Sequence, residues 1–147
     1  MNFWKKKEKY RVMTYTDFET RRIITEVVVS NPLTGLTMKC RGLWDTGGRV
    51  STISQSVIES IGLMPDKKMS YRVQTTTGVH FSAVYPIVLM FDDVGLGCSA
   101  MSCEKIIDEV DIIIGMDIIT KGDFSITNAN GRTEMIFRLP TSGHIGK

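Results

Sequence analysis

The sequence of 147 residues contains little that would tie it to a membrane, a metal or an oxidising compartment. No hydrophobic run approaches the ~20 residues that a membrane-spanning helix needs, and the N-terminus lacks the apolar core of a signal peptide. Cysteines number only three, without metal-site spacing, which favours free thiols in a reducing compartment over a disulfide framework or a zinc site. We therefore expect a soluble, cytoplasmic protein without a metal or another cofactor.

An excess of charge is also missing. Lys and Arg number 18 and Asp and Glu 16, so the formal net charge is +2. This balance gives no global reason to expect nucleic-acid binding, although the run from Lys5 to Arg11 is locally basic. We interpret residues 1–20 as a basic, poorly ordered N-terminal extension, because chain termini are usually loose. Residues 21–140 then form one domain, and residues 141–147 form a C-terminal tail.

What the sequence does contain is a series of short β-type segments. Residues 21–30 are rich in β-branched side chains, and residues 36–43 alternate apolar with polar ones, as in a strand with one buried face. The Pro and Gly between them predict a hairpin. Further strands are expected at residues 50–53, 71–76, 79–91, from 96 onward, 110–114, 124–127 and 132–139, the last two joined by a type I′ turn at Asn130-Gly131.

One helix has clear start and stop signals. Ser54 is a good N-cap for a helix over residues 55–61, Gly62 fits the position after its end, and Pro65 prevents continuation. Residues 116–120 resemble a single helical turn. Many short strands with one helix and one helical turn predict an all-β fold, either a closed barrel or a sandwich.

The chemically distinctive stretch is Asp45-Thr46-Gly47-Gly48, which follows the apolar pair Leu43-Trp44. The glycines let the backbone turn tightly and approach another group closely. On these residues alone a plain turn is the simpler interpretation, since Asp and Gly are common in turns and Thr caps them locally. The rest of the chain favours a functional site at Asp45 over a plain turn.

Three features, in their order and spacing, resemble the retropepsin family, the retroviral-type aspartic proteases. Asp45-Thr46-Gly47 matches the catalytic triplet, and Ile113-Ile114-Gly115 matches the apolar element that packs beneath the active site. Residues 71–85 look like the β-hairpin flap. The helix after Ser54 is more similar to cellular and bacterial relatives than to compact viral enzymes. The resemblance implies an all-β, closed acid-protease barrel with one or two short helices.

The resemblance also implies an aspartic endopeptidase that takes a polypeptide in extended conformation. Such enzymes hold a water between two carboxylates that share one proton. Because the triplet occurs once in this chain, the resemblance implies a homodimer in which Asp45 of each copy meets at the two-fold axis. It assigns Thr46 to a hydrogen-bond clasp across that axis and Gly47 to leaving room for the substrate backbone.

The expected substrate contacts follow from the same resemblance. They are Gly48, Arg49, Ile113 and the flap tip Thr76-Thr77-Gly78. A solvated loop position is an equally good interpretation of Arg49, and Asp111 either lines a pocket that favours basic residues or is an exposed strand-end residue.

The sequence departs from the family at two positions. Gly48 stands where Ala is usual, which loosens the loop without removing any chemistry. Met116 stands where viral enzymes carry an Arg that ties loops and dimer together. Without that Arg, the chain lacks one of the contributions to dimer strength that the viral enzymes have.

A second class of function stays open. The same barrel, catalytically silent, would act as a peptide-binding or dimerisation module that presents a strand edge to an extended peptide. Fold alone does not decide between the two, because one fold carries many functions. Nucleic-acid binding by the basic N-terminus is a weaker hypothesis than the other two, since its basic residues lack the context of a binding motif. We predict neither a nucleic-acid nor a membrane partner.

Overall fold

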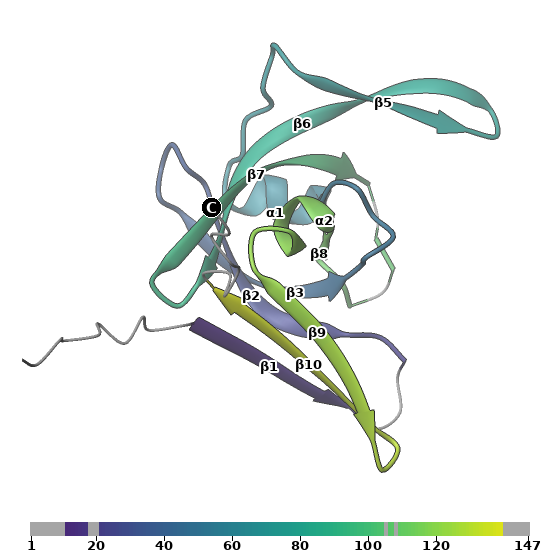
Figure 1. The fold of residues 1–147 in the computed structure, drawn as a ribbon. Helices are drawn as coiled ribbons and strands as arrows, with labels where there is room; N and C mark the ends of the chain where they lie inside the picture. The colour runs from purple at the N-terminus through teal and green to yellow at the C-terminus, as the bar shows by residue number, and fades with distance from the viewer. Residues whose placement is uncertain (1–10, 18–20, 105, 108, 140–147) are drawn as a thin grey trace, which may run out of the picture.

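The computed structural model describes residues 11–17, 21–104, 106–107 and 109–139, which form two sheets and two short helices (Figure 1). The elements are β1 (Arg11–Asp17), β2 (Ile24–Ser30), β3 (Thr37–Trp44), β4 (Thr52–Ser54), α1 (Gln55–Ser60), β5 (Ser70–Thr75), β6 (Gly78–Phe91), β7 (Val94–Cys103), β8 (Ile112–Ile114), α2 (Met116–Ile119), β9 (Asp123–Ala129) and β10 (Arg132–Leu139).

Six of the strands close into a barrel. Its order is β2-β3-β8-β4-β7-β6, and pairing of β2 with β6 closes it. The barrel is mixed, because β3–β8 and β4–β7 run parallel while the other neighbouring pairs run antiparallel. Alternation along β3 buries Cys40, Gly42 and Trp44 and leaves Lys39 and Arg41 exposed, as expected for a strand with one face in the core. The prediction of an all-β, closed barrel is confirmed.

A second sheet, in the order β1-β10-β9, lies against the lower side of the barrel (Figure 1). Asn130 and Gly131 both have positive φ, 53° and 72°, which confirms the predicted type I′ turn between β9 and β10. The inner face of β10 buries Met135, Phe137 and Leu139. The apolar side chains of this sheet therefore pack against the barrel core.

An aromatic cluster joins the second sheet to the barrel. The ring centroid of Trp44, at the end of β3, lies 4.9 Å from that of Phe137 and 5.7 Å from that of Phe124. Phe91 completes the group, at 5.5 Å from Phe137. Aromatic rings bury large areas and prefer such tilted or offset arrangements. The cluster thus fixes the end of β3, the point from which Asp45 leaves the barrel.

β1 is a strand that the sequence analysis did not predict. It pairs with β10 in antiparallel register, from Arg11↔Leu139 to Asp17↔Thr133. It lies within the predicted poorly ordered extension of residues 1–20, where the basic run before it dominates the local composition. Its own Thr-, Tyr- and Val-containing sequence suits a strand. The remainder of that extension, residues 1–10 and 18–20, and the tail, residues 141–147, lie outside the described residues.

Both helices begin where the sequence predicts. Ser54 caps α1, its Oγ accepting a hydrogen bond from the N–H of Val57 (3.4 Å), and Gly62 follows the helix with φ of 62°. α2 begins directly after Gly115 and is one turn long. In the part of the chain that the structure describes, neither helix is long and apolar enough to cross a membrane.

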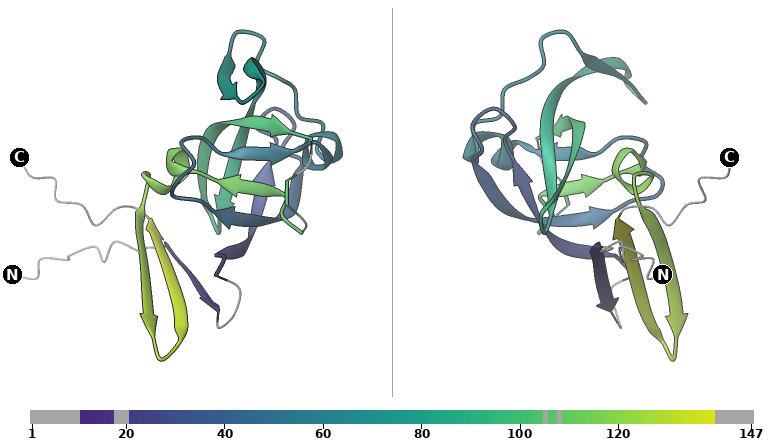
Figure 2. Two further views of the ribbon diagram at one scale, coloured as in Figure 1. Left: turned by 90° about the vertical axis from the view of Figure 1, so that its right-hand side faces the viewer. Right: turned by 60° about the vertical axis from the view of Figure 1, so that its left-hand side comes forward.

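The hairpin of β5 and the first part of β6, residues 70–83, projects from the barrel and is called the flap below (Figures 1 and 2). Its register ends at Thr75↔Gly78, so Thr76 and Thr77 form the loop. The loop therefore falls within the predicted flap tip Thr76-Thr77-Gly78. Gly78 has φ of 131°, a conformation that residues with a Cβ rarely adopt.

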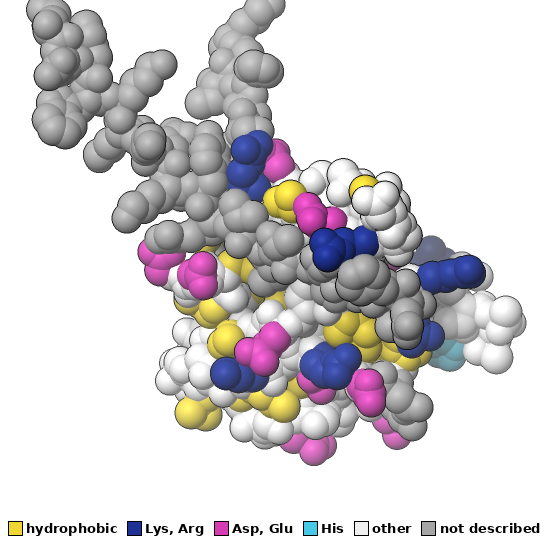
Figure 3. Space-filling model, turned by 90° about the horizontal axis from the view of Figure 1, so that it is seen from below, with side chains coloured by type: hydrophobic (Ala, Val, Ile, Leu, Met, Phe, Trp, Pro, Cys, Tyr) yellow, Lys and Arg dark blue, Asp and Glu magenta, His cyan; other side chains and the backbone are white. Residues whose placement is uncertain are grey.

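The opposite end of the molecule has a mixed surface. Seen from below, acidic and basic side chains are interspersed with hydrophobic ones over the described atoms in view (Figure 3). Neither sign of charge dominates this visible face. The candidate site described next lies beside the flap, not at this end of the molecule.

Candidate active site

Asp45 begins the loop of residues 45–50, called the Asp45 loop below, at the end of β3. Its N–H donates to the carbonyl of Ile114 in β8 (2.9 Å), which ties the loop to the neighbouring strand. Its Oδ1 accepts from the N–H of Gly47 (2.9 Å), and its carbonyl accepts from the N–H of Gly48 (3.2 Å). The carboxylate is half-buried and is oriented by its own loop.

The two glycines after Thr46 keep the space around this carboxylate open. A Cβ on Gly47 would lie 3.2 Å from Asp45 Oδ1, and a Cβ on Gly48 would lie 3.3 Å from Asp45 Oδ2. Contacts this short require the carboxylate to shift by a few tenths of an ångström. Gly48, where the family usually has Ala, therefore leaves the carboxylate more room than an alanine would.

Gly115 supports the loop from beneath. A Cβ at this position would lie 2.8 Å from the carbonyl carbon of Val50 and 2.9 Å from the carbonyl oxygen of Gly48. The next residue, Met116, donates its N–H to that same oxygen of Gly48 (2.7 Å). Only a residue without a Cβ lets β8 and the Asp45 loop approach this closely.

A hydrogen-bonded pair, the buried Ser51 and the half-buried Asp117, ties the end of the loop to α2. The N–H of Ser51 donates to Asp117 Oδ2 (3.0 Å), and its Oγ donates to Asp117 Oδ1 (2.8 Å). The same Oγ accepts from the N–H of Gly115 (3.1 Å). Ser51 is 0% exposed, so the carboxylate of Asp117 satisfies polar groups that water cannot reach.

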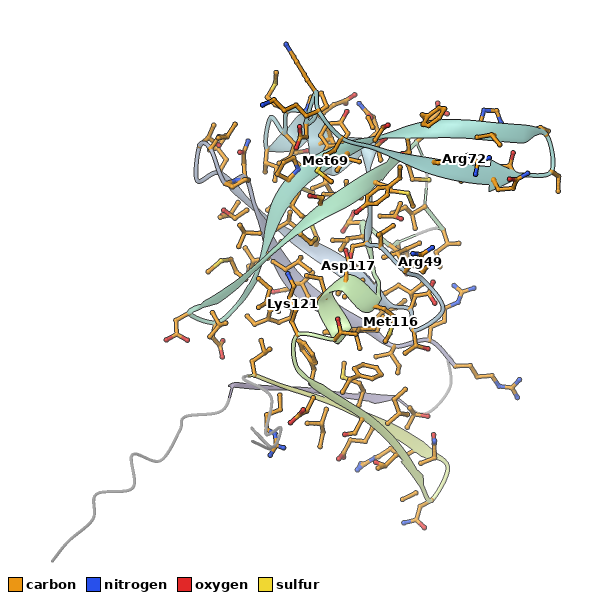
Figure 4. The ribbon with its side chains drawn as sticks, turned by 45° about the horizontal axis from the view of Figure 1, so that its top comes forward. Arg49, Met69, Arg72, Met116, Asp117 and Lys121 are labelled. Carbon is orange, nitrogen blue, oxygen red and sulfur yellow. The ribbon has the colours of Figure 1, made fainter. Side chains whose placement is uncertain are left out.

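Sequence reasoning did not find this pair. Neither Asp117 nor Ser51 is among the residues that the sequence predicts for the site. The available signal was a polar residue, Ser51, between the apolar Val50 and Ile53, which requires a hydrogen-bond partner if it is buried. Figure 4 shows Met116 and Asp117 side by side at the start of α2.

A cleft of about 720 Å³ separates the Asp45 loop from the flap. This is within the usual range for ligand pockets, about 300–1,000 Å³. Its lining comprises Asp45, Gly47, Gly48, Arg49, Val50 and Thr52 from the loop side, Tyr71, Arg72, Val73 and Gln74 from the flap, and Met101 and Ile113 from the barrel. The cleft is therefore bounded on one side by the loop that carries Asp45 and on the other by strand β5.

The structure brings together several residues that the sequence analysis assigned to one site. Asp45, Gly47, Gly48, Arg49 and Ile113 all line the cleft. The remaining predicted residues, Thr46 and the flap tip Thr76-Thr77-Gly78, are not among the described residues that line it. Thr46 is exposed.

The flap tip is organised by its own hydroxyl groups. Thr75 Oγ1 donates to the carbonyl of Gly78 (3.1 Å) and lies 3.0 Å from Thr77 Oγ1. Thr77 Oγ1 in turn lies 3.2 Å from His80 Nε2. His80 is exposed, and this contact gives it a local structural role in the flap.

Asp111 does not border the cleft. Its Oδ2 accepts from the N–H of Arg41 (2.8 Å), and its own N–H donates to the carbonyl of Arg41 (2.9 Å). The N–H of Ser54 donates to the carbonyl of Asp111 (3.0 Å). Asp111 therefore joins β3 to the start of α1, and it is not among the described residues that line the cleft.

The three cysteines are free thiols. Burial, with a smaller contribution from Asp111, raises the pKa of Cys40 to about 12. Burial also raises the pKa of Cys98 to about 12, reinforced by Asp117 and opposed by Lys121 and by a hydrogen bond with Ser51. Both thiols stay protonated at neutral pH, which makes them poor nucleophiles. Within the described residues no group of three or more His, Cys, Asp or Glu side chains is placed to hold a metal ion.

Comparison with known proteins identifies the fold. No family model and no curated protein match the sequence. Among solved structures, the chain is similar to a retropepsin-like aspartic protease from Rickettsia conorii, with a TM-score of 0.58, 12% identity, and coverage of 94% of this chain and 98% of that one. The protein therefore has the retropepsin-like fold, and the resemblance drawn from the sequence is confirmed at that level.

Two more distant structural matches have TM-scores below 0.5. The EIAV protease complexed with the inhibitor HBY-793 has a TM-score of 0.48 and 14% identity, covering 68% of this chain and 86% of that one. The retroviral protease-like domain of Ddi1 from Leishmania major has a TM-score of 0.47 and 17% identity, covering 69% and 79%.

Proposed function

We propose that the protein is an aspartic endopeptidase that acts as a homodimer, with Asp45 of each copy forming the catalytic dyad. The observation that carries the proposal is the position of Asp45. Its half-buried carboxylate lies close to Gly47 and Gly48, just after β3, and borders a cleft with room for an extended peptide. The retropepsin-like fold supports the same class of hydrolase.

The chemistry requires two such carboxylates. When they are held close together, both cannot ionise readily, so they share one proton. The ionised carboxylate takes a proton from a water molecule, which attacks the peptide carbonyl carbon. The protonated carboxylate donates a hydrogen bond to the carbonyl oxygen as negative charge develops there. The dyad titrates as a pair, so its protonation belongs to both copies of Asp45 together.

The arrangement of the loop and the flap supports a dimeric site. Both project to the same side of the barrel, the side that faces the viewer in the left panel of Figure 2. Thr46 is exposed next to Asp45 and does not line the cleft, which leaves it available to a second copy. In the proposed dimer Thr46 clasps its counterpart across the axis, Gly47 admits the substrate backbone, and Thr76, Thr77 and Gly78 close over the peptide. Such an assembly is a closed two-fold dimer, the commonest symmetry of soluble oligomers.

We propose further that residues 21–140 form the protease domain, with β1 from the N-terminal extension completing its second sheet. Seven residue pairs join β1 to β10, which makes this strand part of the sheet that packs on the aromatic cluster. A cytoplasmic location suits a domain with three free thiols.

The decisive experiment replaces Asp45 by Asn. Asp45→Asn keeps the size of the side chain but cannot take a proton from water, and general-base assistance is commonly worth about 10²–10⁴-fold. We expect hydrolysis of a denatured protein or peptide library at mildly acidic pH to fall by at least that factor and the parent activity to be inhibited by pepstatin. Thermal melting should show that the variant is folded.

The control is Asp92→Asn, an exposed acid in the β6–β7 turn whose φ of 54° an asparagine tolerates. This variant should keep parent activity. Undiminished hydrolysis by Asp45→Asn would show that Asp45 is only a turn residue.

Mixing the two proteins tests the dimer. If one Asp45 from each copy is required, an equal mixture of parent and Asp45→Asn that exchanges subunits contains about a quarter parent homodimers, by random pairing of two-fold partners. Activity should therefore fall to about half of that expected from the parent protein present. The Asp92→Asn protein should have no such effect. Full specific activity in a species that ultracentrifugation shows to be monomeric would contradict the dimer.

A further inference from the structure

The cleft carries two arginines that the proposed chemistry does not use. Arg49 lies on the Asp45 loop, and Arg72 lies on strand β5 of the flap. Both side chains are exposed and both line the cleft, from opposite sides. Figure 4 shows them on the same side of the molecule, Arg72 on the projecting hairpin and Arg49 on the loop beneath it.

Within the described part of the chain, neither guanidinium has an ion pair or a side-chain hydrogen bond. Other arginines are paired: Arg41 with Glu109 (3.8 Å) and Arg138 with Asp123 (3.0 Å). Among the described residues that line the cleft, Asp45 is the sole acid, and the proposed mechanism uses it for catalysis. The cleft lining thus has two basic residues for one acid, whereas the whole sequence has nearly equal numbers, 18 basic and 16 acidic.

We propose that Arg49 and Arg72 make the enzyme selective for peptides with Asp or Glu side chains near the scissile bond. This inference rests on the proposed function, because it assigns a substrate class to the same cleft. In the proposed homodimer each copy supplies both arginines, so basic groups flank the dyad on both sides. An extended peptide crossing the dyad would then meet a pair of arginines before and after the cleaved bond.

The chemistry of the guanidinium group favours a carboxylate as its partner. Its planar donors match the two oxygens of a carboxylate, and the resulting bonds are charge-assisted. No existing ion pair has to be broken in the free protein, which removes one cost of binding. Because both arginines are exposed, screening by water keeps each contribution modest, and we expect about two- to fivefold per arginine.

The test uses peptides that differ only in charge at one position. Starting from a peptide that the enzyme cleaves, Glu, Gln and Lys are placed in turn at each of three positions on either side of the cleaved bond. We measure kcat/KM for the parent, Arg49→Gln, Arg72→Gln and the double variant. The control is Arg41→Gln, which removes an exposed arginine outside the cleft.

The parent should prefer Glu over Gln at one or more positions by about two- to fivefold per arginine engaged, and less at 0.5 M salt than at 0.05 M because added ions screen the attraction. Each cleft variant should reduce that ratio, and Arg72→Glu should shift the preference toward Lys. The Arg41→Gln control should keep the parent ratio. Equal losses for Glu and Gln peptides in the cleft variants would overturn the proposal, since the arginines would then bind the peptide backbone.

A binding measurement separates this inference from the proposed function. Fluorescence anisotropy with the same labelled peptides is measured on parent and Asp45→Asn proteins, with and without the arginine substitutions. If no peptide is cleaved, the proposed function fails, yet tighter binding of the Glu peptides that depends on Arg49 and Arg72 still supports the inference. Equal binding of Glu, Gln and Lys peptides overturns it, whether or not hydrolysis occurs.

Discussion

The two sides of the cleft are held in place by different kinds of contact. The Asp45 loop is fixed by residues distant in sequence: Ser51 bonds Asp117, 66 residues away, and Gly115, 64 residues away. The flap is fixed by its own hairpin ladder and by hydroxyl contacts at its tip that span two or three residues. The Asp45 loop is thus held by contacts between residues far apart in the sequence, whereas the contacts at the flap tip join near neighbours.

Burial follows the same division. Ser51 is 0% exposed, whereas Phe81 on the flap is 71% exposed. Regions with few buried contacts open at lower free energy than the core, and lids are drawn from such regions. The difference suggests that substitutions under the loop will change stability and chemistry together, while substitutions in the flap will act mainly on substrate binding.

The largest effect should come from adding a methyl group beneath the loop. In Gly115→Ala the new Cβ would lie within 3 Å of backbone atoms of Gly48 and Val50, which cannot move aside as a flexible side chain would. We expect the free energy of unfolding to fall by about 3 kcal/mol, in line with overpacked interiors, and hydrolysis to fall because Asp45 is displaced.

Gly97→Ala is the matched control for this substitution. Its Cβ would meet nothing closer than a carbonyl oxygen at 4.0 Å, so its stability should stay within about 0.5 kcal/mol of the parent. Urea unfolding and peptide hydrolysis measure both variants. A Gly115→Ala protein as stable and active as Gly97→Ala would remove the argument that β8 fixes the loop.

The next effect should come from the pair of Ser51 and Asp117. Asp117→Ala leaves the N–H and the hydroxyl of Ser51 without their acceptors, and an unsatisfied buried group costs about 1–3 kcal/mol. We expect a loss of about 2 kcal/mol in urea unfolding and a fall in kcat larger than any change in KM. As a matched change in a loop outside the cleft, Asp66→Ala removes a local bond to the N–H of Lys68 (2.9 Å) and should cost less than about 1 kcal/mol. Equal losses in the two variants would mean that Asp117 has no special role.

The sequence predicted the local features of this comparison better than the long-range ones. Ser54 as a helix cap, Asn130-Gly131 as a type I′ turn and the alternation along β3 each depend on neighbouring residues, and the structure has all three. The closure of the barrel by β2 and β6 was expected only as a fold class. Its register depends on contacts across the whole chain, which no local pattern reveals.

The candidate site shows the same limit. Asp45, Gly47, Gly48 and Arg49 are contiguous, so a motif finds them together, and the structure places them on one wall of the cleft. Arg72 and the Ser51–Asp117 pair belong to the site through packing, and their residue types are common on any protein surface. The strand β1 was missed for a related reason, because its partner β10 lies more than a hundred residues away.

The flap gives a prediction of intermediate size. Binding of pepstatin or an extended peptide should protect the backbone amides of residues 75–80 from hydrogen exchange by about tenfold, which corresponds to about 1.4 kcal/mol. The amides of residues 113–117, already bonded within the barrel and loop, should change much less. Protection that is unchanged in the flap, or that rises equally in both segments, would contradict its role as the mobile side of the cleft.

The smallest expected effect is a loss of stability at alkaline pH, which should arise on the side of the cleft that carries Asp45 and not in the flap. Cys40 lies on the strand that delivers Asp45, whereas the flap contains no cysteine. Burial raises the pKa of Cys40 to about 12 from 9.0, so its thiol ionises more readily in the unfolded chain than in the folded protein. The stability that this thiol contributes is complete below pH 9 and is lost as the pH rises toward 12.

At pH 10 the loss should be about 1 kcal/mol, because each pH unit between the two pKa values changes stability by at most about 1.4 kcal/mol. The measurement compares thermal melting of the parent and Cys40→Ala between pH 7 and pH 10.5. The alanine variant is less stable at neutral pH, since it leaves a cavity, but its curve should fall less steeply above pH 9 because it has no buried thiol to ionise. Parallel curves for the two proteins would show that Cys40 does not control the alkaline limit. Cys98→Ala would then be the next variant to compare, because burial raises the pKa of that thiol to about 12 as well.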